Sequence, residues 1–413
     1  MLSVAEALSA VVREIEPFSP ATIPLSDALG LLLAEEVVSD VDSPPFDKSL
    51  MDGYAVRADD IADGRALLKV IEEVTAGRVP TKSIGRGETT RVMTGAPLPQ
   101  GSDAVVRLED TQLDTLSDTV RIDTDPASSA RNVMRRGASL KRGDHVFAPG
   151  RLLRPQELGA LAERGRNAVG VRVRPRVAVL ATGDELVPID ETPKPGQIRN
   201  SNETMLVAQL RVAGAEPVPL GIARDERTHL SERIRAGLEC DMLLLSGGVS
   251  AGKLDLVPSE LEAAGVRQVF HMVNLKPGKP VWFGVWDAAP DNPAGRQDRR
   301  CYVFGLPGNP VSSMVCCELF ARTAIRRLIG YQNPEPQQVR AKLSVAHTTR
   351  GNRPTYHPAR LTWEESEAIV TPVNWQGSAD LRATVDANSM IVFRGVDRSY
   401  AAGDVVDTVL WDR

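Results

Sequence analysis

The sequence predicts a multidomain α/β plus β protein. We expect a doubly wound α/β domain, an inserted small β domain and a C-terminal β-barrel-like domain. In residues 176–329, short apolar runs alternate with amphipathic segments, which is the pattern of a doubly wound fold. Residues 51–147 and those after 334 instead carry short β-type runs separated by Gly, Pro and Asp turns. At 413 residues, the chain is also too long for one ordinary core.

Composition limits the class of protein. Apolar residues make up 42% and charged residues 25%, which is the balance of a globular protein in water. The net charge of −5 argues against nucleic-acid binding through a basic surface. No run approaches the ~20 apolar residues of a membrane span, and the N-terminus carries no apolar leader. The four cysteines lack metal-ligand spacing, so we expect reduced thiols in a cytoplasmic protein.

The N-terminal part should begin with helices and continue as strands. Ser3-Val-Ala-Glu6 is a capping-box pattern that opens a helix to about Ile15, and a second helical pattern covers residues 26–37. Another helix is expected over residues 155–164, packed with the first helical region. The β-type runs between them are Tyr54–Arg57, Leu67–Val74, Thr89–Met93, Ala104–Leu108 and Thr119–Ile122. We therefore expect a helical linker and dimerisation region (1–42 and 148–172) around an inserted β domain (43–147).

The α/β domain is predicted over residues 173–330 and the β-barrel domain over 331–413. The buried strands of the α/β domain are expected at Arg176–Thr182, Glu216–Ile222, Asp241–Ser246 and Cys301–Gly305. Its helices are expected at Glu203–Ala213, Glu226–Leu238, Leu254–Ala264 and Val311–Ile329. The C-terminal β runs are Ala341–Ala346, Ala368–Pro372, Met390–Phe393 and Asp404–Leu410.

Four turns in the α/β domain carry polar or glycine-rich residues. They are Thr182-Gly-Asp-Glu185, Ser246-Gly-Gly-Val-Ser250, Lys276-Pro-Gly-Lys-Pro280 and Leu306-Pro-Gly-Asn-Pro-Val-Ser312. Ligands of doubly wound folds bind at the carboxyl ends of the strands, so these turns should converge. One such turn alone is often an ordinary loop. Four turns at successive strand ends favour a binding site.

The residue types in these turns fit a phosphate with Mg²⁺. Glycines let backbone N–H groups approach an anion closely, and lysines attract an oxyanion as point charges. Mg²⁺ takes hard oxygen ligands and keeps waters, so a few carboxylates suffice. The candidate metal ligands are Asp184, Glu185, Asp225 and Asp255. The sequence holds no P-loop, dinucleotide fingerprint or nucleophile elbow, and its five histidines are scattered.

The same turns resemble a known family. Ser43-Pro-Pro-Phe-Asp47, Met51-Asp-Gly-Tyr-Ala55 and Arg91-Val-Met-Thr-Gly-Ala-Pro-Leu-Pro99 with Ala104-Val-Val106 precede the four turns. Arg199-Asn-Ser-Asn202, Trp375-Gln-Gly-Ser378 and Ala387-Asn388 complete the set. In this order they closely resemble the molybdopterin molybdenumtransferase family, the MoeA-like enzymes also represented by the C-terminal domain of gephyrin. The likeness spans the chain.

The resemblance implies the last step of molybdenum cofactor synthesis. Adenylylated molybdopterin (adenylyl-molybdopterin) and molybdate would give the molybdenum cofactor and AMP, with Mg²⁺ required. It also implies a homodimer whose cleft lies between the α/β domain of one subunit and the inserted domain of the other. Handover from a molybdopterin adenylyltransferase is a further expectation. Neither nucleic acid nor membrane is expected as a partner.

Roles carried over by the resemblance fall into two groups. The candidate catalytic residues are Asp52 and Thr94 of the inserted domain with Glu185, Asp255, Lys276 and Lys279. The candidate cofactor-binding residues are Gly183, Asp184, Asp225, Ser246, Gly247, Gly248, Ser250, Pro307, Gly308, Asn309, Ser312, Arg353 and Ser378. The lysines would contact phosphate or molybdate. Ser312, Arg353 and Ser378 would complete an oxyanion pocket.

The sequence departs from the family pattern at several positions. The family usually reads Arg-Arg-x-Gly-Glu-Asp near the end of the inserted domain, whereas Ala138 and Ser139 stand at the two acidic positions here. Lys48 and Leu50 likewise replace an asparagine and an alanine. Losing a carboxylate near an anionic substrate removes repulsion, but it also removes a possible base or metal contact.

Two other functions are weighed against this one. A molybdopterin adenylyltransferase shares the α/β domain, but the additional domains argue against it. A catalytically inactive cofactor-binding scaffold is supported only by Ala138 and Ser139. The sequence does not choose between molybdate and tungstate, nor between Mg²⁺ and a carboxylate as the group that acts on the phosphoanhydride.

Overall fold

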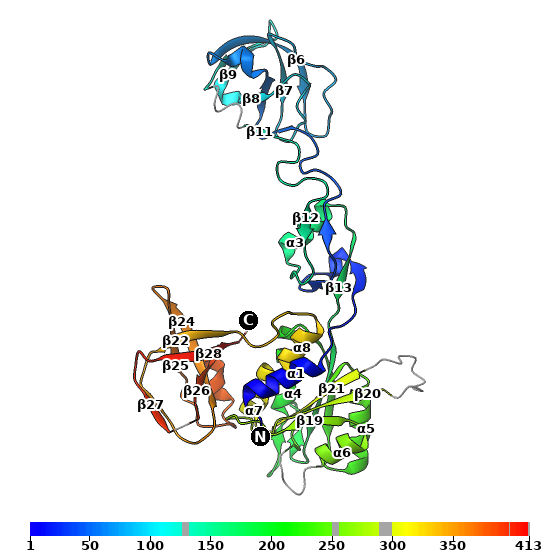
Figure 1. Ribbon diagram of the computed structural model, residues 1–413, viewed down its shortest axis with the longest axis vertical. Coiled ribbons are helices and arrows are strands. Elements are labelled where there is room, and N and C mark those ends of the chain that lie inside the picture. The colour runs from blue at the N-terminus through cyan, green and yellow to red at the C-terminus, as the bar shows by residue number, and fades with distance from the viewer. Residues whose placement is uncertain (126–131, 250–255, 289–299, 396, 412–413) are drawn as a thin grey trace. The chain divides into compact units, whose positions relative to one another are not determined.

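The computed structural model describes residues 1–125, 132–249, 256–288, 300–395 and 397–411. The chain divides into two compact units. The first, called the main unit, comprises Met1–Ala34, Leu152–Arg154 and Ala168–Arg413. The second, called the inserted unit, comprises Glu35–Arg151 and Pro155–Asn167. Figure 1 shows the elements of both units.

The inserted unit contains a six-stranded sheet of order β8-β5-β7-β6-β10-β9. Its strands are β5 (Gly53–Val56), β6 (Arg65–Val74), β7 (Glu88–Val92), β8 (Ala104–Arg107), β9 (Thr111–Asp114) and β10 (Thr119–Asp123). Five of the six were predicted, because each carries apolar side chains that the sheet buries, as Tyr54 and Ile122 show. The inserted unit also contains η2 (Ala58–Ile61), η3 (Leu108–Asp110) and helix α3 (Pro155–Glu163). Two further strand pairs belong to it: β4 (Lys48–Ser49) with β11 (Val133–Met134), and β3 (Val37–Val38) with β12 (His145–Phe147).

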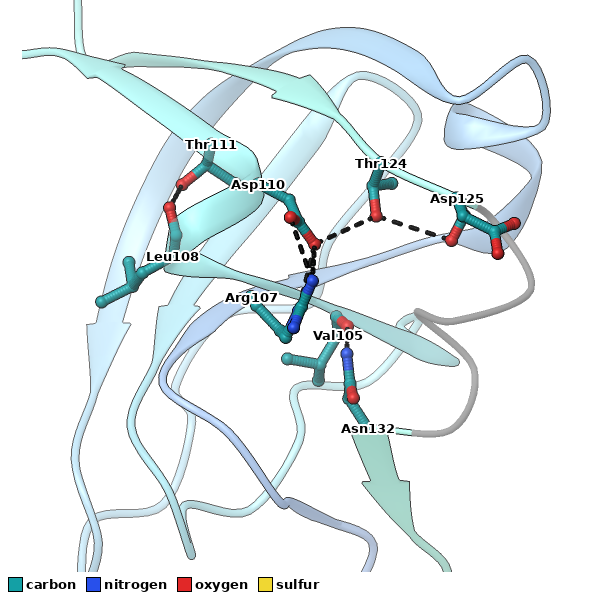
Figure 2. Close-up of polar contacts among 8 residues, drawn as sticks. All are labelled: Val105, Arg107, Leu108, Asp110, Thr111, Thr124, Asp125 and Asn132. Atoms are coloured by element: carbon teal, nitrogen blue, oxygen red, sulfur yellow. Dashed lines mark hydrogen bonds and ion pairs between the residues drawn. The ribbon is translucent and has the colours of Figure 1, made fainter.

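One corner of this sheet is fixed by polar contacts, drawn in Figure 2. At the end of β8, the Arg107 guanidinium donates to both carboxylate oxygens of Asp110 at 3.0–3.1 Å. The Asn132 amide donates to the Val105 carbonyl oxygen at 2.8 Å and is buried. These contacts attach the β8–β9 turn and the start of the segment that leads to β11.

The expected helix over residues 26–37 is wrong. Helix α1 (Val4–Glu14) forms as predicted, with Ser3 and Glu6 making the capping box. Residues 25–38 instead form η1 (Leu25–Asp27), β2 (Leu32–Leu33) and β3. Strand β2 belongs to a sheet of order β1-β13-β2, where β1 is Ala21–Pro24 and β13 is Ala168–Arg172. Gly30, at φ +75°, breaks the helical pattern, and pairing with β13 decides the conformation of the leucines that follow.

The α/β domain lies in the main unit and has a sheet of order β17-β14-β18-β21-β20-β19. Strands β14 (Arg176–Thr182), β17 (Glu216–Ala223), β18 (Met242–Ser246) and β21 (Arg300–Leu306) are parallel, as expected. The edge strand β19 (Arg267–His271) and its neighbour β20 (Trp282–Asp287) were not predicted, and β20 runs antiparallel to both strands beside it. Short strands β15 (Leu186–Val187) and β16 (Ile198–Arg199) pair beside the sheet.

Both faces of this sheet are buried. Val179 and Leu244 contribute to one core cluster, whereas their neighbours Leu180 and Leu245 contribute to another. The first cluster includes residues of α1, α4 (Ser201–Val212), α7 (Pro310–Cys316), the π-helical Cys317–Ala321 and α8 (Arg322–Leu328). The second includes α5 (Arg227–Leu238) and α6 (Val257–Ala263), on the other side of the sheet (Figure 1). This two-sided covering confirms the doubly wound prediction.

The C-terminal domain is a closed barrel of order β22-β25-β24-β26-β28, which confirms the predicted architecture. Its strands are β22 (Gln338–Leu343), β24 (Thr355–Glu364), β25 (Glu367–Pro372), β26 (Ser389–Phe393) and β28 (Val405–Leu410). Strand β24 was not predicted, because its central Pro358 is uncommon within a sheet. Strands β23 (His347–Thr349) and β27 (Arg398–Tyr400) form a separate two-stranded sheet in this domain. The domain also contains η6 (Arg382–Asp386).

Candidate functional site

Three glycine-rich turns meet at the carboxyl edge of the α/β sheet. Ala181, Ser246 and Leu306 lie in register at the ends of the adjacent strands β14, β18 and β21. The turns that follow line one cavity of about 700 Å³. The predicted site residues that line it are Gly183, Glu185, Asp225, Ser246, Gly247, Gly248, Pro307, Gly308 and Asn309. The strand-end rule therefore brings together nine residues whose sequence positions span more than a hundred residues.

The turns pack backbone against backbone, and this requires glycine. Gly247 has φ +102°, and a Cβ on it would lie 2.6 Å from the carbonyl oxygen of Thr182. A Cβ on Gly308 would lie 3.6 Å from the Cα of Gly247. The N–H of Gly247 donates to the Leu306 carbonyl oxygen at 3.0 Å. Among the described residues, the N–H of Gly248 makes no hydrogen bond, which leaves it for a ligand in the cavity.

The acidic side chains lie beside the first of these turns. The Asp184 carboxylate accepts from the Asp225 N–H at 3.2 Å, and Arg224 donates to the carbonyl oxygens of Asp184 and Leu186. Asp184, Glu185 and Asp225 are all exposed to solvent. Asp255 and Ser250 lie outside the described residues.

These carboxylates fit Mg²⁺ by the chemistry of their donor atoms. Within the part of the chain that the structure describes, no group of three or more His, Cys, Asp and Glu side chains is placed to hold a metal ion. Mg²⁺ is usually held by one or two carboxylates together with waters and substrate phosphates. Two hard-oxygen side chains at the cavity, Glu185 and Asp225, satisfy that smaller requirement.

The lysine-containing turn is tied to the C-terminal domain. The Lys276 N–H donates to the Pro354 carbonyl oxygen at 2.8 Å, and the Tyr356 N–H donates to the Lys276 carbonyl oxygen at 2.7 Å. The Arg353 guanidinium donates to the Leu275 carbonyl oxygen at 3.1 Å. Lys276 and Lys279 are exposed but do not line the cavity, whereas Pro280 of the same turn does. We expected the lysines to line the same cavity as the glycines. Only Pro280 of the lysine-containing turn lines it, whereas the two lysines do not.

The remaining predicted oxyanion residues lie at the start of α7. Ser312 is buried, and the N–H of the preceding Val311 donates to the Ser378 carbonyl oxygen at 3.0 Å. Ala379, the next residue, lines the cavity. The Cys316 thiol lies 3.6 Å from the Gly278 carbonyl oxygen, so the lysine turn packs against α7. Backbone contacts therefore gather these segments around one end of the cavity.

Thr182 and Asn202 are among the lining residues that were not assigned a role from the sequence. Thr182 ends β14, and its buried hydroxyl has no hydrogen-bond partner among the described residues. Asn202 lies in the first turn of α4, and its amide reaches Ser246 and Gly308. The signal for both was present, since each belongs to a motif that also supplies predicted site residues or carries the family likeness.

In the inserted unit, Asp52 and Thr94 contact each other directly. The Thr94 N–H and hydroxyl donate to one Asp52 carboxylate oxygen at 2.7 and 2.9 Å. These two hydrogen bonds hold the pKa of Asp52 below its usual value, because they stabilise the charged carboxylate. The two residues predicted for the inserted domain therefore lie together in this unit.

The departures at Ala138 and Ser139 lie in a turn held by other carboxylates. The Arg136 N–H and the Arg135 guanidinium donate to Asp47, each at 2.7 Å, and Arg136 also pairs with Asp42 at 2.6 Å. Hydrogen bonds from this turn hold the pKa of both aspartates below the usual value, with the backbone donors contributing most. Ala138 and Ser139 are exposed. The turn thus keeps its shape without the usual acidic pair.

A second cavity, of about 620 Å³, lies in the barrel domain. Three arginines (Arg340, Arg394 and Arg398) line it with Tyr400 and Asp407. Arg394 lies 4.0 Å from Asp407, and the Arg398 guanidinium lies over the Tyr400 ring. This arginine cavity is an alternative place for an anion.

Fold and site together define a multidomain α/β protein with a cavity lined by glycine-rich turns at the carboxyl edge of its sheet. Residues 2–165 match the family described as MoeA N-terminal region (domain I and II). Residues 178–327 match a probable molybdopterin binding domain, and residues 340–411 match the MoeA C-terminal region (domain IV).

Similar proteins extend over the whole chain. A molybdopterin molybdenumtransferase of Staphylococcus aureus is 33% identical over 99% of this chain and 95% of its own length. The enzyme of the same name from Staphylococcus epidermidis is 30% identical over the same shares. The crystal structure of a molybdopterin biosynthesis moeA protein from Pyrococcus horikoshii has a TM-score of 0.79 at 29% identity and covers both chains fully. The chain belongs to the molybdopterin molybdenumtransferase family.

The structure also bears on the expected reduced thiols and on the expected lack of a membrane span. All four cysteines are buried, and none of them forms a disulfide. In the described part of the chain, no helix has both the length and the apolar character needed to cross a membrane.

Proposed function

We propose that the protein inserts molybdenum into adenylyl-molybdopterin, taking molybdate and releasing the molybdenum cofactor and AMP. The observation that carries the proposal is the cavity formed by the turns after β14, β18 and β21. Its size suits a nucleotide-sized ligand, and its glycines let backbone N–H groups approach phosphate oxygens. Family membership over the full chain supplies the choice of ligand.

The site residues act mainly by positioning and charge. The Gly248 N–H can donate to a phosphate oxygen, while the Lys276 and Lys279 ammonium groups lower the cost of bringing molybdate close to it. Cleavage of the phosphoanhydride by water or by a molybdate-derived oxygen leaves AMP. This reaction requires no protein nucleophile, and the Ser246 hydroxyl at the cavity contacts Asn202 and Ser313, not a histidine that could activate it. Ground-state alignment is the main contribution of such a site.

Mg²⁺ fits the proposal as a cofactor. Glu185 and Asp225 would hold it at the cavity, with Asp184 supporting Asp225 through its backbone hydrogen bond. Asp255 is a further proposed ligand. When bound, Mg²⁺ supplies Lewis-acid polarisation of the phosphoryl oxygens. Glu185 or Asp255 can alternatively orient the attacking water.

The finer expectations of the family likeness belong to the same proposal. We infer a cytoplasmic homodimer in which Asp52 and Thr94 serve the site of the partner subunit. Ser312, Arg353 and Ser378 would hold molybdate together with the lysines. The substrate would come from an enzyme that adenylylates molybdopterin, either by handover or from solution. Sedimentation at several protein concentrations tests the dimer.

The direct test is AMP release from adenylyl-molybdopterin, with Mg²⁺ and with molybdate or tungstate supplied separately. We expect release that depends on the oxyanion and is lost on chelation of Mg²⁺. Replacing Glu185 by Ala should lower the rate about 100-fold, the scale of a lost transition-state interaction. The matched control is Glu216→Ala. It removes an exposed glutamate at the start of β17, the end of that strand away from Asp225, and should leave the rate unchanged.

Each rival function predicts a different result in this assay. Consumption of ATP with molybdopterin and without molybdate would identify an adenylyltransferase. A parent protein that binds the cofactor without turnover would be a scaffold. Unchanged turnover in Glu185→Ala and in Asp255→Ala would refute the site assignment while leaving the reaction in place.

A further inference from the structure

Asn202 joins two of the three turns that form the cavity. Its Nδ2 donates to the Ser246 hydroxyl oxygen at 2.8 Å and to the Gly308 carbonyl oxygen at 2.7 Å. A carbonyl oxygen can only accept, so the Nδ2 end of the amide must face Gly308. Both N–H groups of the amide are thereby used. The residues it joins lie 44 and 106 positions away in the chain.

The hydrogen bonds continue beyond Ser246 in one direction. The Ser313 hydroxyl donates its single proton to the Pro307 carbonyl oxygen at 2.5 Å. Ser313 can therefore only accept in its 3.4 Å contact with the Ser246 hydroxyl, so Ser246 donates there. The chain runs from Asn202 through Ser246 and Ser313 to Pro307. Since Pro307 and Gly308 are consecutive, it closes a ring around the ends of β18 and β21.

This ring controls the backbone that faces the ligand. Ser246 precedes Gly247 and Gly248, and Gly308 lies against Gly247. A shift at either end would move glycine N–H groups that must lie within about 3 Å of a phosphate oxygen. Glycine turns have no side chain to pack them in place, so the amide bridge from α4 is their lateral support.

We propose that Asn202 is a positioning residue that sets the spacing of the β18 and β21 turns for the pterin nucleotide. The inference rests on the proposed function for the identity of the ligand. The positioning itself depends only on the contacts described above. Asparagine suits the role because one planar NH₂ group reaches two acceptors on different strands. Aspartate has the same shape but offers no donor, and its charge would repel the Gly308 carbonyl oxygen.

The test compares Asn202→Asp and Asn202→Ala with Gln209→Ala. Gln209 lies on the same helix and also bridges elements through its amide, donating to the Met314 carbonyl oxygen and to Glu318. It does not line the cavity. Gln209→Ala is thus a matched loss of an α4 amide bridge away from the ligand.

Hydrogen–deuterium exchange of the ligand-free protein gives the first readout. Both Asn202 variants should exchange about tenfold faster in peptides covering 245–249 and 306–310, as expected when two hydrogen bonds are lost. Gln209→Ala should leave those peptides unchanged. Equal protection in Asn202→Asp and the parent would overturn the inference, because the isosteric variant removes both donors and adds a repulsive charge without changing the shape of the side chain.

AMP release gives the second readout. We expect kcat/KM to fall about 100-fold in Asn202→Asp, which is the cost of misplacing a reacting group by about 1 Å. Gln209→Ala should match the parent in kcat/KM even if its melting temperature falls. Faster exchange in the turns with unchanged kcat/KM would overturn the catalytic part of the inference. If the parent itself shows no turnover, the proposed function fails, while the exchange data still decide whether Asn202 holds the turns.

Discussion

Gly247→Ala should remove activity more completely than its small size suggests. The added Cβ would lie 2.6 Å from the Thr182 carbonyl oxygen and 2.9 Å from the Thr182 hydroxyl oxygen. Both are rigidly placed at the end of a buried strand, so the glycine turn must move instead. The residue also keeps φ +102°, which costs an alanine about 1–2 kcal/mol. Relief of the overlap costs a further 1–3 kcal/mol or so, typical of overpacking.

The control for Gly247→Ala is Gly403→Ala. Gly403 has φ +89°, but a Cβ there meets nothing within 4 Å, so this variant carries the backbone strain without the overlap. We expect Gly403→Ala to lose about 1–2 kcal/mol of unfolding free energy and to keep full AMP release. Gly247→Ala should lose more stability and lower kcat/KM about 100-fold, measured by denaturant titration and by AMP release. Equal stability losses together with full activity would refute the close packing of the turns as a requirement.

Three further results are expected. Gly308→Ala should leave the free energy of unfolding within about 0.5 kcal/mol of the parent's, because the added Cβ makes only ordinary contacts. It should nevertheless weaken AMP binding in calorimetry, because the Cβ fills the space between two glycine turns. Unchanged binding would show that this backbone does not approach the ligand. Thr94→Val should raise the lowered pKa of Asp52 in an NMR titration, because it removes one of the two hydrogen bonds to the carboxylate. The stability that Asp52 contributes is present at neutral pH and is lost as pH falls through its folded pKa, and this contribution should shrink in the variant. An unchanged pKa of Asp52 would contradict the assigned contact. Burial lowers the pKa of His357 to about 4, so the unfolded chain binds a proton at a higher pH than the folded chain does. The free energy of unfolding should therefore fall by on the order of 3 kcal/mol as pH drops from about 6.5 to 4. Thermal melts of His357→Gln should show a melting temperature that depends less on pH, and a pH dependence identical to the parent's would show that another group causes the effect.

Strands β14, β18 and β21 were predictable because each is an apolar run buried on both faces, whereas β17 is only partly buried. Arg176–Thr182 matches the observed strand at both ends, since Val179 and Leu180 pack into different clusters and no polar position interrupts them. Strand β19 at the edge and its neighbour β20 were missed, because their antiparallel pairing depends on residues that are not adjacent in sequence. For the same reason residues 26–37 were misassigned, as local helical spacing was outweighed by pairing with β13.

The site divides in the same way. Gly247 and Gly308 could be placed together from the sequence, because parallel strands put their carboxyl ends at one edge. The association of Leu275 and Lys276 with Arg353 and Pro354 could be expected only from family likeness, since it depends on how a second domain contacts the turn. Asn202 belongs to the Arg199-Asn-Ser-Asn202 motif, but its role was missed because nothing local shows that its side chain bonds to residues 44 and 106 positions away.

A crystal structure of the protein with AMP and molybdate tests the central claim most directly. We predict that the phosphate of AMP lies among the turns that follow Thr182, Ser246 and Leu306, within hydrogen-bond distance of the Gly248 N–H. Molybdate should lie nearby, toward Lys276. Nucleotide density confined to the arginine cavity of the barrel, beside Arg340 and Arg398, would contradict the account.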